Sequence, residues 1–351
     1  MKQHRSWKLL AVVGVLALLA AACPGGGDEG GGLLSEIQER GTLNCGINGS
    51  VPGFGFVDEQ GNESGFDVEY CQVVAAAILG DANAVEYSQL TAEQRFTALQ
   101  AGEIDVLIRN TTWTATRDGS EGATFLTTTF YDGQGMMVPS DSDIQSIDDM
   151  SGAAVCVLSG TTTELNLSSL SEERGLDLQI SSFEDNETLQ SAFIQGQCDA
   201  WTSDKSQLAA IRGAWPDAEG GPEGLTFLDE TISKEPLGPL VRDGQTALAG
   251  AVNWAVIATI QAEEFGIDSS NVDQIRDTTE DPDIQRFLGV QEDFDAGLDL
   301  PVDFAYQVIS QVGNYAEIYE RNVGPDTPLG LERGLNALWT EGGLLYPPPY
   351  R

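Results

Sequence analysis

The chain has 351 residues, in which 17 Lys and Arg stand against 55 Asp and Glu, giving a formal net charge of -38 at pH 7. A polyanion of this strength repels nucleic acids and anionic membrane surfaces, so we expect no nucleic-acid partner. The only histidine, His4, lies in an N-terminal leader, which removes Ser-His-Asp and Cys-His catalysis and histidine metal sites from the rest of the chain. The sequence therefore predicts no metal and no cofactor.

The first 22 residues have the features of a secretory signal peptide, because basic residues precede an apolar stretch that is too short to span a bilayer comfortably. The run LLAAAC, residues 18–23, resembles the lipobox of bacterial lipoproteins, in which the cysteine becomes the lipidated first residue. This resemblance implies that Cys23 is lipidated and that residues 23–32, which are rich in glycine, form a short flexible tether. The alternative is ordinary cleavage near Ala22, which leaves Cys23 a free thiol.

After the tether, strand-like and helix-like segments alternate in two similar halves. Alternation of this kind predicts an α/β fold with two lobes, each a mainly parallel sheet flanked by helices. In the first half we expect helices at 65–80 and 92–102 and strands at 42–47, 85–90 and 104–108. The glycines and proline of residues 130–139, FYDGQGMMVP, suit a segment that crosses between the lobes.

The second half repeats the pattern and ends in a helical region. We expect a second crossing segment at 231–241, so that lobe 1 consists of residues 33–135 and 236–351 and lobe 2 of residues 136–235. The predicted strands are 153–158, 178–183, 199–203 and 225–230, and the predicted helices are 161–175, 184–197, 206–215, 245–265, 281–289, 303–322 and 329–341.

Four cysteines remain after the leader and Cys23, an even number in an exported chain. This predicts two disulfides, for which three pairings are possible. The positions of the cysteines along the predicted elements favour the local pairing, Cys45 with Cys71 and Cys156 with Cys198, one in each lobe.

Open α/β sheets bind ligands at the carboxyl ends of their strands, and two polar loops occupy such positions here. The loop RNTTWTATR, residues 109–117, follows the strand at 104–108 and contains Arg117 among threonines, a combination that suits a carboxylate clamp. The alternative is that Arg117 pairs with a surface acid. In the second half SGTTTELN, residues 159–166, opens a helix whose free amides favour an anion, although plain N-capping also explains it.

Asp204, at the end of the strand at 199–203, is a candidate partner for an ammonium group. An α-amino acid requires such an acid in addition to donors for its carboxylate. The alternative is that Asp204 caps the helix that follows.

Five longer segments are similar to the polar amino acid substrate-binding proteins of ABC transporters, and most similar to the general L-amino acid binding branch. They are GFDVEYCQVVAAAI, LTAEQRFTALQAGEIDVLIRNTTWTATRD, YDGQGMMV, SGTTTELNL and CDAWTSDKSQL, and the resemblance runs from about Thr42 to the tail. The resemblance implies a type II periplasmic-binding-protein fold, with two α/β lobes joined by two crossing segments.

The resemblance also implies roles for single residues. Arg117 matches the arginine that holds the ligand α-carboxylate, with help from Thr112, and Asp204 matches the acid that receives the α-ammonium. The remaining matches are Asn110 for main-chain contact, Thr161 and Thr162 for amides donated to the same carboxylate, and Val51 with Phe54 for the side-chain pocket. Binders of cationic amino acids place an aromatic where this chain has Val51, so a stacked cationic ligand is not expected.

These features predict a receptor that captures an L-amino acid outside the cytoplasm and delivers it to ABC permease subunits. We expect a monomer that is held to the membrane by its lipid anchor alone, with no catalytic residues. Two alternatives remain: a lyase similar to arogenate or prephenate dehydratase, which would require a general acid in the cleft, and a ligand-sensing receptor.

Overall fold

The computed structural model describes residues 32–291 and 294–351. The predicted signal peptide, Cys23 and all but the last residue of the predicted tether lie outside these ranges. None of the helices within them has both the length and the apolar character that crossing a membrane requires.

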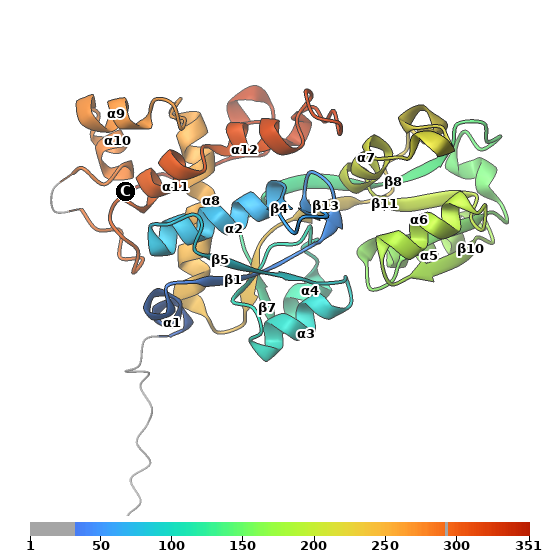
Figure 1. The fold of residues 1–351 in the computed structure, drawn as a ribbon, viewed down its shortest axis with the longest axis horizontal. Coiled ribbons are helices and arrows are strands. Elements are labelled where there is room, and N and C mark those ends of the chain that lie inside the picture. Colours follow the sequence, from blue (N-terminus) through green and yellow to red (C-terminus); the bar gives the residue numbers. More distant parts are fainter. Residues whose placement is uncertain (1–31, 292–293) are drawn as a thin grey trace, which may run out of the picture. The chain divides into compact units, whose positions relative to one another are not determined.

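The first lobe is built on a five-stranded sheet. Its order is β5 (Val85–Gln89), β1 (Leu43–Ile47), β6 (Val106–Leu107), β14 (Leu240–Arg242) and β7 (Ala123–Phe125). β1 is parallel to β5 and β6, whereas β14 is antiparallel to β6 and β7. Because β14 comes from the last third of the chain, the C-terminal part returns to the first lobe (Figure 1).

Helix α2 (Phe66–Leu79) lies at the centre of the first lobe and is buried along most of its length. It packs on α8 (Thr246–Glu264) and α11 (Phe304–Gln311). Its apolar residues on all sides are typical of a helix enclosed by others. A disulfide joins Cys71 of this helix to Cys45 of β1, the local pairing that the sequence favours.

The second lobe contains a sheet in the order β10 (Gln179–Phe183), β9 (Ala154–Leu158), β11 (Ala200–Asp204), β8 (Phe130–Pro139) and β12 (Leu225–Phe227). Alternate side chains of a strand face opposite sides, so Met136 and Met137 belong to different apolar clusters. Helix α5 (Thr162–Arg174) contributes to one cluster, and α6 (Asn186–Ile194) and α7 (Lys205–Gly213) to the other. A disulfide joins Cys156 to Cys198.

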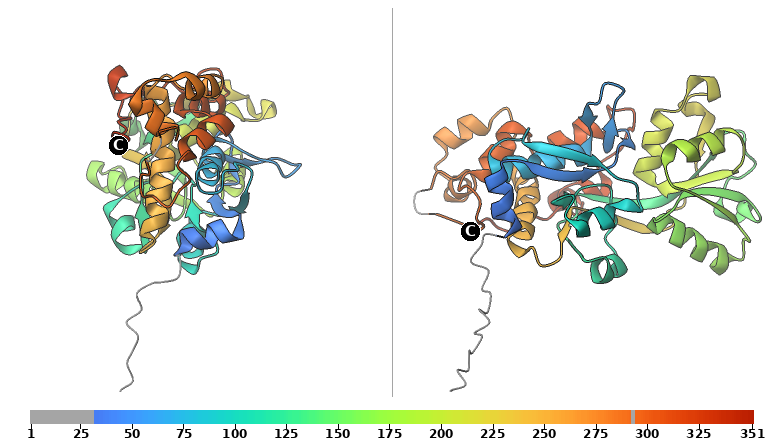
Figure 2. Two further views of the ribbon diagram at one scale, coloured as in Figure 1. Left: turned by 90° about the vertical axis from the view of Figure 1, so that its left-hand side faces the viewer. Right: turned by 60° about the horizontal axis from the view of Figure 1, so that its bottom comes forward.

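Two antiparallel strands connect the lobes. β8 pairs with β13 (Lys234–Leu237) over residues 130–133 and continues into the second sheet (Figure 2). The lobe boundaries expected at 135/136 and 235/236 therefore fall inside these two strands. In this ladder Asp132 lies directly opposite Glu235.

The other elements complete the two lobes and the C-terminal region. They are α1 (Leu33–Arg40), β2 (Ser50–Val51), β3 (Gly55–Val57), β4 (Glu63–Ser64), α3 (Gln94–Ala101), α4 (Ala115–Ser120), α9 (Val272–Thr278), α10 (Pro282–Phe287), α12 (Tyr315–Asn322) and the 3-10 turns η1 (Ile147–Met150), η2 (Asp217–Glu219), η3 (Pro222–Gly224), η4 (Gly334–Asn336) and η5 (Trp339–Glu341).

The C-terminal region differs from the sequence expectation in two places. The helix expected at 303–322 is divided into α11 and α12, because Gly313 adopts a φ of 109° and Asn314 begins a new helix with a capping box. The prediction of a helix at 329–341 is wrong. Only the turns η4 and η5 form there, since Gly330, Gly334 and Gly342 all take positive φ values.

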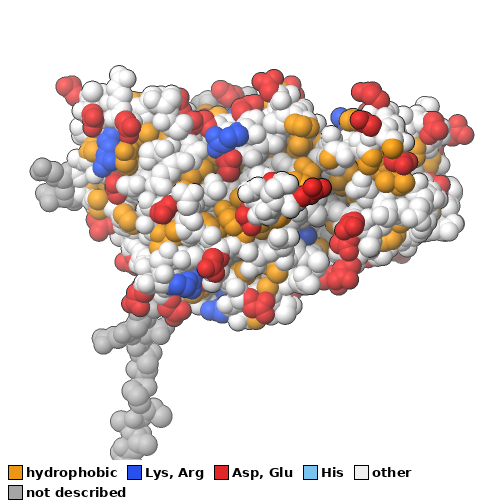
Figure 3. Space-filling view, in the orientation of Figure 1, with side chains coloured by type: hydrophobic (Ala, Val, Ile, Leu, Met, Phe, Trp, Pro, Cys, Tyr) orange, Lys and Arg blue, Asp and Glu red, His pale blue; other side chains and the backbone are white. Residues whose placement is uncertain are grey.

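Acidic side chains are scattered over the face shown in Figure 3, with few basic ones between them. The acidic side chains on this face are spread out rather than gathered in one patch, and their like charges repel one another.

Candidate functional site

The two lobes meet at a small cavity of about 20 Å³. It lies at the carboxyl ends of β6, β9 and β11, where the alternating fold predicts a ligand site. Its lining contains three arginines, three consecutive threonines and one acid. The lining residues are Ala92, Arg95, Arg109, Asn110, Thr112, Arg117, Leu158, Thr161, Thr162, Thr163, Ser203, Asp204 and Gln207.

Arg117 is 8% exposed and points its guanidinium across the cleft. Its Nη1 donates to the carbonyl of Thr112 at 3.0 Å, and its Nη2 donates to the carbonyl of Gly160 in the other lobe at 3.4 Å. Thr114 caps α4 by accepting from the Arg117 backbone amide at 3.2 Å, which orients the start of this helix. Arg117 is therefore buried and forms no ion pair with a described residue, contrary to the surface-pair alternative.

The N-terminus of α5 supplies the second-lobe side of the cavity. Thr161 caps the helix by accepting from Glu164 N at 3.1 Å, so the capping alternative is satisfied as well. Gly160 has a φ of 70°, and a Cβ there would lie 2.9 Å from Glu93 Cγ, so glycine permits the close approach of the two lobes.

Thr162 faces both lobes through its hydroxyl. Its Oγ1 donates to the Glu235 carboxylate at 2.7 Å and lies 3.3 Å from Thr112 Oγ1. A hydroxyl has one proton, and that of Thr162 is donated to Glu235, so Thr112 is the donor in the second bond. The Thr162 oxygen is then an acceptor toward the cavity, while its backbone amide belongs to the free amides at the helix start.

Asp204 is 5% exposed and makes no capping bond to α7, contrary to the capping alternative. No described donor forms a hydrogen bond with its carboxylate. Burial raises its pKa well above the ordinary value, and the neighbouring Asp132 and Glu235 raise it further, opposed by Arg117 and Arg95. Burial also raises the pKa of Asp132 to about 6. A cation beside Asp204 would stabilise its ionised carboxylate, which burial and the neighbouring acids destabilise.

Arg95 and Arg109 were missed as site residues by the sequence analysis. Arg95 lies on α3 and is 2% exposed, and Arg109 follows β6 and is 5% exposed. The Phe96 ring lies below two of the cations, 5.2 Å from Arg95 Cζ and 5.6 Å from Arg117 Cζ. Both arginines lie in segments that carry the family resemblance, but neither the helix pattern around Arg95 nor the loop that begins at Arg109 tells which polar side chain faces a cleft.

Five side chains form a closed ring of hydrogen bonds that links the two lobes. Asn48 Nδ2 donates to Asn110 Oδ1 at 3.2 Å, and Asn110 Nδ2 donates to Gln207 Oε1 at 3.2 Å. Gln207 Nε2 donates to Asn186 Oδ1, and Asn186 Nδ2 donates to Ser50 Oγ, both at 3.0 Å. Ser50 Oγ returns to Asn48 Oδ1 at 3.1 Å. Asn110 has a φ of 31°, held by a bond from its amide to Asp67 at 2.7 Å.

Val51 and Phe54 do not line this cavity, which corrects their expected contact with ligand. Val51 is fully buried and Phe54 is 1% exposed. The Phe54 ring lies 5.9 Å from Phe66 and 5.2 Å from Phe130 between centroids, so it contributes to the core of the first lobe. Trp113 is 42% exposed and stacks on Phe125, away from the lining.

An open hollow of about 530 Å³ adjoins the cavity and shares Arg117, Thr161 and Thr162 with it. Its acidic lining residues are Glu93, Glu121 and Glu164. Material entering the cavity from this side therefore passes an acidic rim.

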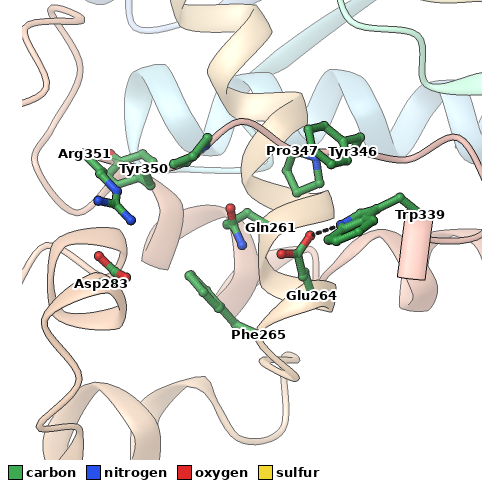
Figure 4. Close-up of a pocket in the computed structure, with 10 residues that line it drawn as sticks. Gln261, Glu264, Phe265, Asp283, Trp339, Tyr346, Pro347, Tyr350 and Arg351 are labelled. Atoms are coloured by element: carbon green, nitrogen blue, oxygen red, sulfur yellow. Dashed lines mark hydrogen bonds between the residues drawn. The ribbon is translucent and has the colours of Figure 1, made fainter. Parts of the chain in front are cut away.

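A separate cavity of about 190 Å³ lies where the C-terminal segment packs on α8 (Figure 4). Three of its polar side chains have structural partners. Trp339 Nε1 donates to Glu264 at 3.1 Å, and Asp283 pairs with Arg286. We interpret this cavity as part of the packing of the C-terminal segment.

The sequence comparison decides the family. The model of the bacterial extracellular solute-binding proteins, family 3, matches residues 43–267. The chain belongs to this family. Its members are binding proteins, so the lyase alternative is not supported, and the family places the protein outside the cytoplasm.

Three similar proteins show that the similarity covers nearly the whole chain of this solute-binding protein. The general L-amino acid-binding periplasmic protein of Rhizobium johnstonii is 47% identical over 91% of this chain and 92% of its own length. The glutamate/glutamine/aspartate/asparagine-binding protein of Rhodobacter capsulatus is 42% identical over 98% of this chain and its full length. A periplasmic binding protein from Brucella ovis, solved with glutathione bound, is 44% identical with a TM-score of 0.87, covering 91% of this chain and 99% of that one. The fold is therefore the two-lobed type II fold.

Proposed function

We propose that this solute-binding protein captures an L-amino acid between its lobes and delivers it to the permease of an ABC transporter. One observation carries the proposal: Arg117 and Asp204 face one buried cavity from opposite lobes, and neither has an ion-pair partner in the described chain. A zwitterionic α-amino acid supplies the matching carboxylate and ammonium.

Each residue around the cavity has a role in this proposal. Arg117 grips the α-carboxylate with a bidentate fork, and the amides at the start of α5, at Thr161 and Thr162, donate to the same group. Thr112 adds a hydroxyl and Asn110 a main-chain contact. Asp204 receives the α-ammonium. The relatives from Rhizobium johnstonii and Rhodobacter capsulatus are both named as amino acid-binding proteins, which supports this ligand class.

Ligand entry requires the lobes to separate. The cavity of about 20 Å³ accommodates roughly one water molecule, which is far less than an amino acid needs. We propose that the lobes, divided within β8 and β13, open about these two strands and close when a ligand bridges Arg117 and Asp204. A ligand that contacts both lobes binds the closed form better and shifts the population toward it.

The γ-glutamyl peptides are a second ligand class, because they retain a free α-amino acid end. The hollow of about 530 Å³ beside the clamp offers room for the rest of such a peptide. The Brucella ovis relative was solved with glutathione. The acidic rim opposes the terminal carboxylate of glutathione, so we expect it to bind more weakly than a free amino acid.

We further propose that the protein is a monomer anchored to the outer face of the membrane through lipidated Cys23. The Cys23→Ser variant should then move from the membrane fraction to the soluble fraction, and mass spectrometry of the native protein should detect diacylglycerol on Cys23. A native protein with an unmodified Cys23 in the soluble fraction would refute the anchor.

Calorimetric titration of the mature chain with the common L-amino acids and glutathione tests the ligand class. We expect saturable binding of at least one amino acid. Arg117→Ala should abolish binding of every ligand alike, because the clamp grips a shared group, whereas Arg174→Ala at an exposed ion pair should change nothing. Absence of any binding, or selective loss in Arg117→Ala, would contradict the proposal.

A further inference from the structure

The chain after residue 267 lies beyond the part that the family model matches, and this extension is packed on the first lobe. Its helices α11 and α12 contact the central helices α2 and α8. Arg333 fastens the segment that follows them, because it pairs with Glu263 of α8 at 2.9 Å. The Arg333 Cζ also lies 5.1 Å from the ring centroids of Tyr315 and Tyr319. The extension is therefore a fixed part of the first lobe.

The extension holds the first-lobe end of the connecting strand β8. Tyr315 Oη donates to the carbonyl of Thr129 at 2.8 Å. Asn336 is 4% exposed and bonds both backbone groups of Tyr131, since its Oδ1 accepts from the amide at 2.7 Å and its Nδ2 donates to the carbonyl at 3.1 Å. On its other edge Tyr131 lies opposite Pro236 of β13. Asn336 thus takes the place of a neighbouring strand on the edge that β13 leaves open.

The same extension also contacts the second lobe. Gly213, the last residue of α7, lies so close to it that a Cβ there would be 2.7 Å from the carbonyl oxygen of Pro328. On the same helix, Ala210 is 1% exposed and belongs to the apolar cluster of the first lobe, which also includes Leu329. Because α7 begins directly after Asp204, the helix touched by the extension is the one that follows the acid of the proposed clamp.

These contacts differ in their dependence on the distance between the lobes. The bonds to Thr129 and Tyr131 lie at the first-lobe end of β8 and persist when the lobes separate, whereas the contacts of Pro328 and Leu329 with α7 cross between the lobes and break. An interaction shifts an equilibrium only if it differs between the two states. The contact with α7 therefore favours the closed form, and the fixed end of β8 confines bending to the part of the strand after Tyr131.

We infer that residues 323–336 form a strap that favours the closed lobes and so sets ligand affinity from outside the cleft. This inference rests on the proposed function, in which the lobes open about β8 and β13, and it adds the segment that controls the opening. No residue of the strap is among those that line the ligand cavity. The strap therefore acts through lobe closure alone and affects every ligand to the same extent.

A methyl group placed between the strap and α7 tests the inference. Gly213→Ala puts its Cβ 2.7 Å from the Pro328 oxygen when the lobes are closed, although alanine suits a helix better than glycine. Overpacking of this kind should weaken the Kd of every common L-amino acid that the unmodified protein binds by ~5-fold or more, through faster dissociation in stopped-flow measurements. It should also increase the radius of gyration of the ligand-free protein in X-ray scattering. Gly250→Ala in α8 is the matched control, because a Cβ there meets no atom within 4 Å.

Hydrogen exchange tests the attachment of the strap to β8. In Asn336→Ala the Tyr131 amide loses its acceptor and should exchange at least ~10-fold faster than in the unmodified protein, with or without ligand, while the amides of β1 keep their rates. Unchanged exchange of the Tyr131 amide would show that Asn336 does not hold the strand and would overturn the strap.

The two Gly213→Ala readouts separate a strap from a purely structural contact, which would lower the unfolding midpoint but leave the Kd and the ligand-free radius of gyration unchanged. Unchanged values of both, or weaker binding of some amino acids only, would overturn the inference while leaving amino acid binding intact. Absence of any amino acid binding by the unmodified protein would instead refute the proposed function, and the radius of gyration of ligand-free Gly213→Ala would still decide whether the strap holds the lobes closed.

Discussion

Replacing Asp204 by Asn removes the negative end of the proposed clamp with little change in shape. The carboxylate is 5% exposed and has no hydrogen-bond donor among the described residues, so an incoming ammonium would be its first direct partner. Asp132 and Glu235 are close enough to shift its pKa, and their negative charge remains in the variant. The ammonium would therefore lose its direct contact but keep part of the attraction.

The size of the effect follows from this geometry. Truncating one partner of a buried, hydrogen-bonded charge pair costs about 2 to 5 kcal/mol. Since two acids remain near the site, we expect the lower part of this range, about 2 to 3 kcal/mol, which corresponds to a ~30- to 150-fold weaker Kd. A ligand without the ammonium, such as the matching 2-hydroxy acid, should bind the variant and the unmodified protein nearly equally.

The stability of the protein and its affinity for ligand should depend on pH in opposite directions through Asp204. Asp204 has a raised pKa in the folded protein, so its contribution to stability is complete below the ordinary value of 3.8 and is lost as the pH rises through its folded pKa. At neutral pH the ligand-free Asp204→Asn protein should therefore unfold at a higher temperature than the unmodified protein. Ligand affinity behaves oppositely, because protonation of Asp204 removes the partner of the ammonium as the pH falls.

Calorimetry and thermal unfolding between pH 4 and pH 8 measure both effects. The control is Asp148→Asn, an acid whose side chain is 80% exposed. If Asp204→Asn leaves the amino acid Kd within about 3-fold of the unmodified value at neutral pH, Asp204 does not receive the ammonium and the proposed clamp is wrong.

Three other changes test the surroundings of the site. Glu235→Gln removes one of the acceptors around Thr162, so we expect a ~5- to 20-fold weaker ligand Kd by calorimetry, and an unchanged Kd would show that this bond does not position the threonine. Gln207→Leu breaks two bonds of the interlobe ring and should increase the radius of gyration of the ligand-free protein in X-ray scattering, whereas identical curves would show that the ring does not hold the lobes together. Replacing Cys156 and Cys198 together by Ser opens a loop with a sequence separation of 42 and should lower the free energy of unfolding by about 4 kcal/mol in denaturant titration, while a change below about 1 kcal/mol would contradict the entropic account.

The difference between predicted and missed site residues has a physical cause. Asp204 ends a strand and Arg117 lies in the polar segment that follows another, where the alternating pattern of the chain indicates a ligand edge, so local sequence was sufficient to select them. Arg95 lies within a helix, and its two polar neighbours in the sequence, Glu93 and Gln94, are exposed. Nothing local distinguishes the one that is buried against the cleft.

Val51 and Phe54 were expected in the site but lie outside it. A resemblance to the family suggested the side-chain pocket, but both residues are apolar and the first lobe has an aromatic cluster within reach, so burial in the core is more favourable than exposure in a cleft.

The sequence by itself determined the classes of structure and chemistry available to this protein. Its alternating periodicity predicted two α/β lobes, the absence of histidine after His4 removed catalysis that depends on histidine, and the segments at the ends of predicted strands indicated Arg117 and Asp204. The tertiary structure alone decided which charges are left without partners. Burial and pairing depend on residues far apart in the chain, as between Arg95 and Gly160 or Asn110 and Gln207, and such contacts exist only once the lobes are packed together.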